Sequence, residues 1–125
     1  NNESKKIKQS LYDMIAAETS GRGYSVMHSL ISSLPVKEII TTNYDEMMER
    51  AWQYSGSFSV LPYYPRKGCS RWLLKLHGTV SHPQEIVLTK RDYIRYSDRF
   101  AALAGIVQST LLTRHLLSIG FSLED

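Results

Sequence analysis

The sequence predicts an α/β fold in which a mostly parallel sheet is flanked by helices. Short apolar runs alternate along the chain with segments whose apolar residues recur at helical spacing. The run WLLKL at 72–76 contains one lysine among large apolar residues, which is typical of a strand buried on both faces of a parallel sheet. Alternation of this kind characterises layered α/β proteins.

The strands are predicted from short runs of apolar and β-branched residues. Four such runs are EIITT (38–42), WLLKL (72–76), EIVLT (85–89) and HLLSIG (115–120). The first and last are expected to be buried strands, like WLLKL. The segment between the first two runs ends in SGSFSVLPYYPRKGCSR, which is rich in glycine, serine and proline and is expected to be a loop.

The helices are predicted from apolar residues three and four positions apart. The expected helices cover about 4–18, from Tyr24 to just before Pro35, from Asp45 through Trp52, from Thr89 onward, and about 98–113. The start at Thr89 has a separate argument, because Asp92 follows three residues later and gives the segment capping-box form.

Composition excludes several classes of protein. The 125 residues suffice for one domain, and no apolar run approaches the length of a membrane span or a secretory signal core. The net charge of +3, from 15 basic and 12 acidic residues, is scattered and gives no nucleic-acid-binding face. The one cysteine, Cys69, excludes an internal disulfide and a zinc site built from cysteine pairs, and suits a reducing cytoplasm.

Polar clusters follow three of the predicted strands. They are TTNYD at 41–45, His77-Gly78, and GFS at 120–122. Right-handed crossovers would bring all three to the same edge of the sheet, where parallel α/β sheets bind their ligands. The sequence therefore predicts a ligand site at the carboxyl ends of the strands.

The residue types in these clusters allow a functional and a structural interpretation. His77 could act as a general base at neutral pH, or it could be a loop histidine bonded to a carbonyl. Asn43 and Asp45 alternate with Tyr44 and can face one way, yet both residue types are also favoured at the start of the helix that follows.

The glycines and serine after the strands are open to the same two interpretations. Gly78 would allow a sharp turn or the close approach of a ligand. Gly120 and Ser122 could offer backbone N–H groups and a hydroxyl to phosphate or ribose, or form an ordinary turn.

Taken together, TTNYD, LKLHG followed by IVLTKRDYIRY, and LLSIGFSLED resemble the sirtuin-like domain family over about residues 34–125. The closer resemblance is to its zinc-less branch, which includes NAD hydrolases of bacterial anti-phage defence and other regulatory proteins. The resemblance implies a Rossmann-like, mostly parallel sheet, NAD as the substrate and no metal.

The resemblance also implies roles for individual residues. Asn43 would hold the nicotinamide riboside and a water, Asp45 would lie near the nicotinamide pocket, and His77 would contact the ribose hydroxyls and act as the base. The expected catalytic residues are therefore Asn43, Asp45 and His77. The expected NAD-binding residues are Thr42, Asn43, Asp45, Gly78, Gly120, Ser122 and Asp125.

The sequence departs from the family pattern in three places. One cysteine cannot build the four-cysteine zinc module of the deacylating members, and the segment from His77 to Ile86 is too short to hold it. The glycine-rich first strand of the family is absent, and SGRGYS does not replace it because no apolar strand precedes it. The chain stops at GFSLED, before the family's usual last strand. We therefore expect residues 1–125 to form a single, incomplete domain of a larger protein.

Three functional hypotheses follow from the sequence. The first is hydrolysis of NAD⁺ to nicotinamide and ADP-ribose, as the effector domain of an antiviral, immune or regulatory protein that works with neighbouring domains or as a homo-oligomer. The second is a non-catalytic module that binds NAD or ADP-ribose, which the missing glycine loop favours. The third is NAD-dependent protein deacylation, which would be recognised by O-acetyl-ADP-ribose as a product.

Overall fold

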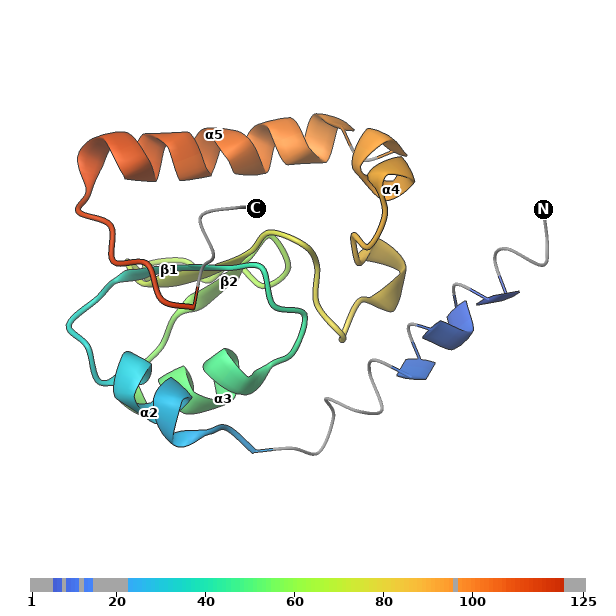
Figure 1. Cartoon of the computed structure of the whole chain (residues 1–125). Helices are drawn as coiled ribbons and strands as arrows, with labels where there is room; N and C mark the ends of the chain where they lie inside the picture. Colours follow the sequence, from blue (N-terminus) through green and yellow to red (C-terminus); the bar gives the residue numbers. More distant parts are fainter. Residues whose placement is uncertain (1–5, 8, 12, 15–22, 96, 121–125) are drawn as a thin grey trace.

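The computed structural model describes residues 6, 7, 9–11, 13, 14, 23–95 and 97–120. A small parallel sheet forms the middle layer, with helix α5 (Ser97–Thr113) along one face and helices α2 (Val26–Ser32) and α3 (Met47–Trp52) on the other (Figure 1). The α/β class, the parallel sheet and the flanking helices are thus confirmed.

The described residues contain three strands: β1 (Glu38–Thr41), β2 (Ser59–Leu61) and β3 (Trp72–Lys75). They lie in the order β1-β3-β2, and both neighbours run parallel to β3. Leu73 and Leu74 of the central strand are completely buried, as the WLLKL run predicts. β1 is only half-buried because it lies at an edge of this sheet, so the expectation of a buried strand at 38–42 was wrong in that respect.

The core on the α2 and α3 side explains why these segments are helical. Met48 and Trp52 come from α3 and pack with Phe58 and with Leu73 of β3. The Trp52 and Phe58 ring centroids are 4.9 Å apart. The apolar spacing of α3 therefore reflects one buried helix face, which fixes where the loop from β1 enters the helix.

The helices after the sheet were also predicted. Helix α4 (Lys90–Arg95) begins directly after Thr89, and α5 covers the predicted 98–113. Asp92 Oδ2 accepts hydrogen bonds from the backbone N–H groups of Leu88 and Thr89, at 3.2 and 3.0 Å, and from the Thr89 hydroxyl at 2.9 Å. This confirms the role of the Thr89 and Asp92 pair at the start of the helix.

Two predicted strands do not form. A 3₁₀ turn at Pro83–Glu85 replaces the start of the predicted strand 85–89; Ile86 and Val87 after it are buried without entering the sheet. Residues 115–120 form an irregular, exposed segment in place of a buried strand. In both cases the apolar residues are present, but the segment makes no strand ladder with a neighbour, and an extended chain becomes a strand only through that pairing.

Two smaller differences concern the loop and the first helix. Strand β2 lies inside the segment predicted to be a loop, because its three residues are too few to give a pattern. The described residues between 6 and 14 are helical, as predicted for 4–18. Their apolar residues Ile7, Leu11 and Met14 are nevertheless exposed. Among the described residues, no helix is both long and apolar enough to cross a membrane.

Candidate functional site

The ends of β1 and β3 bring two of the predicted polar clusters side by side. Thr41 is paired with Lys75 in the parallel register, and the Leu76 N–H donates to the Thr41 carbonyl at 3.0 Å. The chain therefore leaves the sheet at the same level in both strands, toward Asn43 on one side and His77 on the other. The segments that follow β1 and β3 are therefore neighbours because these two strands pair.

The third predicted cluster is not brought there by a strand. Gly120 is exposed and follows the irregular segment 115–119, so the expectation that it ends a strand was wrong. Its positive φ of 68° places it in a turn with nothing near its α-carbon on the side where a side chain would lie. Ser122 and Asp125 lie outside the described residues.

The loop between β1 and α3 presents Asn43 and Asp45. The Asn43 side chain is exposed, and its backbone N–H donates to Thr41 Oγ1 at 3.1 Å. One carboxylate oxygen of Asp45 accepts from the Met47 N–H at 3.0 Å, at the first turn of α3. The N-cap of α3 is Glu46, so Asp45 is not the capping residue, but its bond to the first helical N–H orients the carboxylate. Thr42 lies between β1 and this loop and is half-buried.

His77 lies half-buried between two tyrosine rings. The ring centroids of Tyr44 and Tyr93 are 6.4 and 6.3 Å from that of His77, and Tyr93 meets it edge-on. Burial lowers the pKa of His77 below its usual 6.5. The imidazole is therefore neutral at neutral pH and able to accept a proton.

Gly78 is required by the packing of the loop. Its φ is 101°, and a β-carbon there would lie 2.8 Å from the Ile86 Cα and 2.9 Å from the Glu85 carbonyl oxygen. The turn after His77 is thus pressed against the backbone of residues 85–86, where only glycine fits. The Val87 N–H completes the contact by donating to the His77 carbonyl at 2.9 Å.

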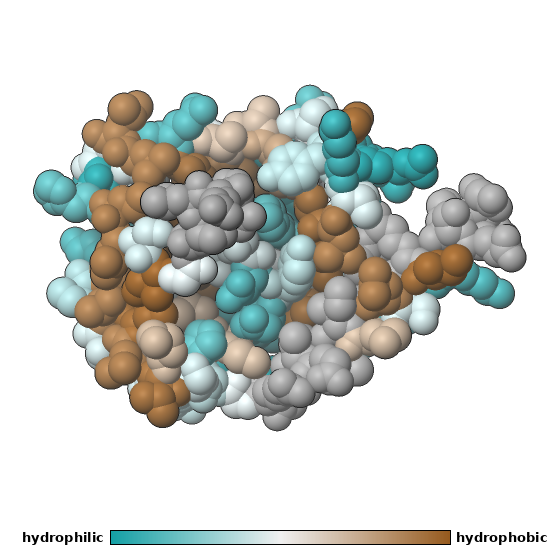
Figure 2. Space-filling view, viewed as in Figure 1, coloured by the Kyte–Doolittle hydropathy of each residue, from teal (hydrophilic) through white to brown (hydrophobic). Residues whose placement is uncertain are grey.

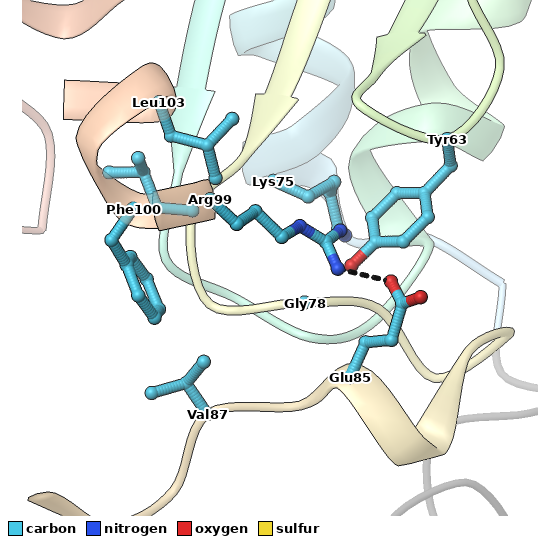
Figure 3. Close-up of a pocket in the computed structure, with 9 residues that line it drawn as sticks. Tyr63, Lys75, Gly78, Glu85, Val87, Arg99, Phe100 and Leu103 are labelled. Atoms are coloured by element: carbon cyan, nitrogen blue, oxygen red, sulfur yellow. Dashed lines mark hydrogen bonds and ion pairs between the residues drawn. The ribbon is translucent and has the colours of Figure 1, made fainter. Parts of the chain in front are cut away.

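A small cavity lies beside Gly78, and the side chains that line it hold the turn after His77 in place (Figure 3). The Arg99 guanidinium from α5 donates to Glu85 at 2.5 Å, and its centre lies 5.1 Å from the Tyr63 ring. Burial raises the pKa of Tyr63, with Arg99 acting in the opposite direction. Arg99 therefore ties α5 to the segment that covers Gly78.

Asn43 and Asp45 line a larger groove of about 290 Å³. Its other walls come from β1, from α2 and α3, and from the segment after α5, with Thr41, Ile31, Met48, Leu116 and Leu117 among the lining residues. His77 and Gly78 do not line this groove. The structure thus joins Asn43 with Asp45 in one groove, while His77 lies on the neighbouring strand end outside it.

Lys75 was missed by the sequence analysis. Its side chain is only 1% exposed; the ammonium lies 3.0 Å from Glu49 Oε1 and donates to the Asp45 carbonyl. Burial raises the pKa of Glu49, opposed by the charge of Lys75. The only signal in the sequence was a lysine inside the apolar run WLLKL, and a lysine there is equally compatible with a side chain that reaches solvent.

Comparison with known families identifies the domain. Residues 37–125 match the family described as the SIR2-like domain. The chain belongs to the SIR2-like domain family. The match covers both strand ends described above, so the sirtuin-like resemblance of TTNYD and LKLHG is confirmed.

Curated proteins similar to this SIR2-like domain include two named NAD(+) hydrolase ThsA, from Acinetobacter baumannii (strain 532279) and Bacillus cereus (strain MSX-D12). Each is 30% identical over 104 residues, which is 78% of this chain and 22% of the relative. Defense-associated sirtuin 2 of Bacillus subtilis is 28% identical over 106 residues, 79% of this chain and 10% of that protein. The chain thus spans about a fifth or less of the length of these relatives.

Metal ligands are not clustered in the part of the chain that the structure describes, where no group of three or more His, Cys, Asp or Glu side chains is arranged to hold an ion. Cys69 donates through its Sγ to the carbonyls of Ser57 and Arg71, at 3.2 and 3.4 Å.

Proposed function

We propose that this SIR2-like domain hydrolyses NAD⁺ to nicotinamide and ADP-ribose. The observation that supports the proposal is the parallel pairing of β1 with β3, whose carboxyl ends lead to the Asn43–Asp45 loop and to His77. The names of the relatives, NAD(+) hydrolase ThsA, support the same activity. That the protein acts in defence is a further part of the proposal, supported by the name of Defense-associated sirtuin 2.

The reaction breaks the bond between nicotinamide and the ribose C1′. The bonding electrons move to the pyridinium nitrogen, so nicotinamide leaves as a neutral molecule and positive charge develops on the ribose. Water adds to C1′ and loses one proton, which gives ADP-ribose. The site must orient the ring, hold the water and accept a proton.

The three polar residues at the strand ends have suitable chemistry for these tasks. The exposed Asn43 can hold the water and the ribose through its amide, and Asp45, which lines the same groove, can orient the nicotinamide through its carboxylate. The neutral imidazole of His77 can bond the ribose hydroxyls and accept the proton. A positioned base of this kind contributes about 10²–10⁴ in rate.

A second candidate is a module that binds NAD or ADP-ribose without cleaving it. The observation in its favour is that His77 does not line the groove formed by Asn43 and Asp45. In a hydrolase the bound ribose must contact both His77 and the groove formed by Asn43 and Asp45. In a binding module, His77 is a packed loop residue between Tyr44 and Tyr93.

The test is incubation of the full-length protein with NAD⁺ and chromatography of the products. We expect nicotinamide and ADP-ribose from the wild type, and turnover lowered by about 10²–10⁴ in His77→Ala. His82→Ala is the matched control, since His82 stacks on Tyr63 at 4.6 Å and lines neither the groove of Asn43 and Asp45 nor the small cavity beside Gly78. Equal turnover in wild type and His77→Ala would refute the role of His77. NAD⁺ binding without products would favour the second candidate, and O-acetyl-ADP-ribose would indicate deacylation.

A further inference from the structure

Lys75 joins three elements at the candidate site. It is the last residue of β3, two positions before His77; its ammonium donates to the carbonyl of Asp45 in the loop after β1. The same ammonium pairs with Glu49 in α3 at 3.0 Å. Lys75 lines both the groove of Asn43 and Asp45 and the small cavity beside Gly78 (Figure 3). It is thus a buried side-chain link between the two strand ends, in addition to the backbone bonds from Leu76 to Thr41 and from Val80 to Tyr44.

The pair is poorly arranged for stability alone. Removing two charges from water costs several kcal/mol per ion, which is recovered only when every charged atom is well bonded. Glu49 Oε2 is buried and has no hydrogen-bond partner among the residues that the structure describes. Apolar residues of similar volume commonly replace such a pair without loss of stability. The arrangement is therefore better explained by what the ammonium holds, which is the backbone of Asp45.

The Asp45 carbonyl is an effective point at which to hold this loop. The Asp45 carboxylate is already oriented by the Met47 N–H at 3.0 Å, and the Asn43 N–H is bonded to Thr41 at 3.1 Å. The bond from Lys75 adds an anchor from the opposite strand. Together these contacts fix the Asn43–Asp45 backbone relative to the strand that carries His77.

We propose that Lys75, held by Glu49, is a positioning residue that sets the Asn43–Asp45 loop against His77. The inference rests on the proposed NAD⁺ hydrolysis for its catalytic consequence. Because its side chain is only 1% exposed, Lys75 acts through the loop that it holds and not on the substrate itself. Loss of its ammonium displaces the loop, and misplacement by about 1 Å can lower turnover by about 10²-fold.

The test uses the full-length protein with the double variant Lys75→Met/Glu49→Leu, the single variant Lys75→Met, and Phe58→Leu as a control for stability. Lys75→Met leaves Glu49 buried and unpaired and lowers Tm. The double variant removes both charges and restores Tm to near the wild-type value. Phe58 packs against Trp52 in the core and is not part of the Asn43–Asp45 loop, so Phe58→Leu loosens only the core packing.

Two measurements on the double variant decide the proposal. We expect kcat to fall by about tenfold or more although Tm is restored, and to stay near the wild-type value in Phe58→Leu. We also expect faster hydrogen exchange of the amides at 42–48, with no change in α5. Restored Tm together with wild-type kcat and wild-type exchange at 42–48 would overturn the inference and leave the pair purely structural.

The exchange measurement separates this inference from the proposed function. If the wild type does not hydrolyse NAD⁺, the proposed function fails. The positioning role of Lys75 is then tested by hydrogen exchange of the amides at 42–48 alone. Faster exchange there in the double variant supports it, and unchanged exchange overturns it.

Discussion

The runs WLLKL (72–76) and HLLSIG (115–120) are alike in sequence and opposite in structure. Both contain a pair of leucines and end at a glycine turn. Leu74 is completely buried in the central strand, whereas Leu116 and Leu117 are 70% and 66% exposed. The difference is the number of neighbours. β3 has a strand on each side and helices on both faces, and 115–120 has no strand partner (Figure 1).

The exposed leucines belong to a wider apolar band. It runs from the end of α5 down to α2 at the left of the space-filling view (Figure 2). The exposed large apolar residues of the chain from α2 to Leu34 and of the chain around the end of α5 include Met27, Leu30, Leu34, Leu111, Leu112, Leu116 and Leu117. An apolar run therefore indicates a segment suited to burial, but only the neighbours decide whether it becomes a strand.

The largest expected contrast is in stability. Leu74→Ala should lower the free energy of unfolding by about 2–5 kcal/mol, because it leaves a cavity in the central strand. Leu117→Ala should change it by less than about 0.5 kcal/mol, because the side chain is mostly in solvent. Chemical denaturation of the two variants measures the difference. A cost at Leu117 equal to that at Leu74 would show that 115–120 is buried in the protein in solution.

The glycines at the ends of the two runs, Gly78 and Gly120, should also differ in how much stability is lost when each is replaced by alanine. Gly78→Ala should cost about 1–3 kcal/mol for the strained backbone, with an added clash against the backbone of residues 85–86. Gly120→Ala has a positive φ but open space around it, so it should cost only about 1 kcal/mol. Thermal unfolding of both variants tests this, and equal losses would mean that residues 85–86 do not pack on Gly78.

The two histidines that follow WLLKL, His77 and His82, should differ in their effect on pH dependence. Burial lowers the pKa of His77 below 6.5, so its neutral form, the form that accepts a proton, is present down to lower pH. Below that pKa, kcat/KM for NAD⁺ should fall about tenfold for each pH unit, and above it the profile should be flat. His82 is the control, because it lines neither the groove of Asn43 and Asp45 nor the small cavity beside Gly78, and His82→Ala should leave the profile unchanged. A midpoint above 6.5 in the wild type would contradict the assignment.

The smallest effect should come from the ion pair that joins the two regions. Arg114, just after α5, lies 3.4 Å from Glu38 at the start of β1, and its side chain is largely exposed. An exposed pair contributes about 0–1 kcal/mol. Arg114→Gln should therefore change the free energy of unfolding by less than about 0.5 kcal/mol at 0.15 M salt. A loss of several kcal/mol would show that this contact, and not the sheet, holds 115–120 in place.

Much of the fold could be predicted because the signals were local. Apolar spacing identified α2, α3 and α5, and the Thr89 and Asp92 pair identified the start of α4. The runs 38–42 and 72–76 identified β1 and β3, and parallel pairing then implied that Asn43 and His77 lie at adjacent strand ends.

The rest depended on partners that a local pattern does not encode. Residues 85–89 pack as an irregular segment because the His77 carbonyl and the Tyr44 hydroxyl bond the backbone of Val87, at 2.9 Å each. Strand β2 has only three residues, which is too short for an apolar pattern to predict it. The buried position of Lys75 depends on Glu49, 26 positions earlier in the chain, and the position of His77 outside the groove depends on the tyrosines that flank it.

The most direct test of the site is a crystal structure of the full-length protein with ADP-ribose bound. The account predicts that the ribose lies at the ends of β1 and β3, within about 3 Å of the His77 imidazole and beside Asn43. ADP-ribose bound elsewhere, with Asn43 and His77 both out of reach of the ribose, would contradict it.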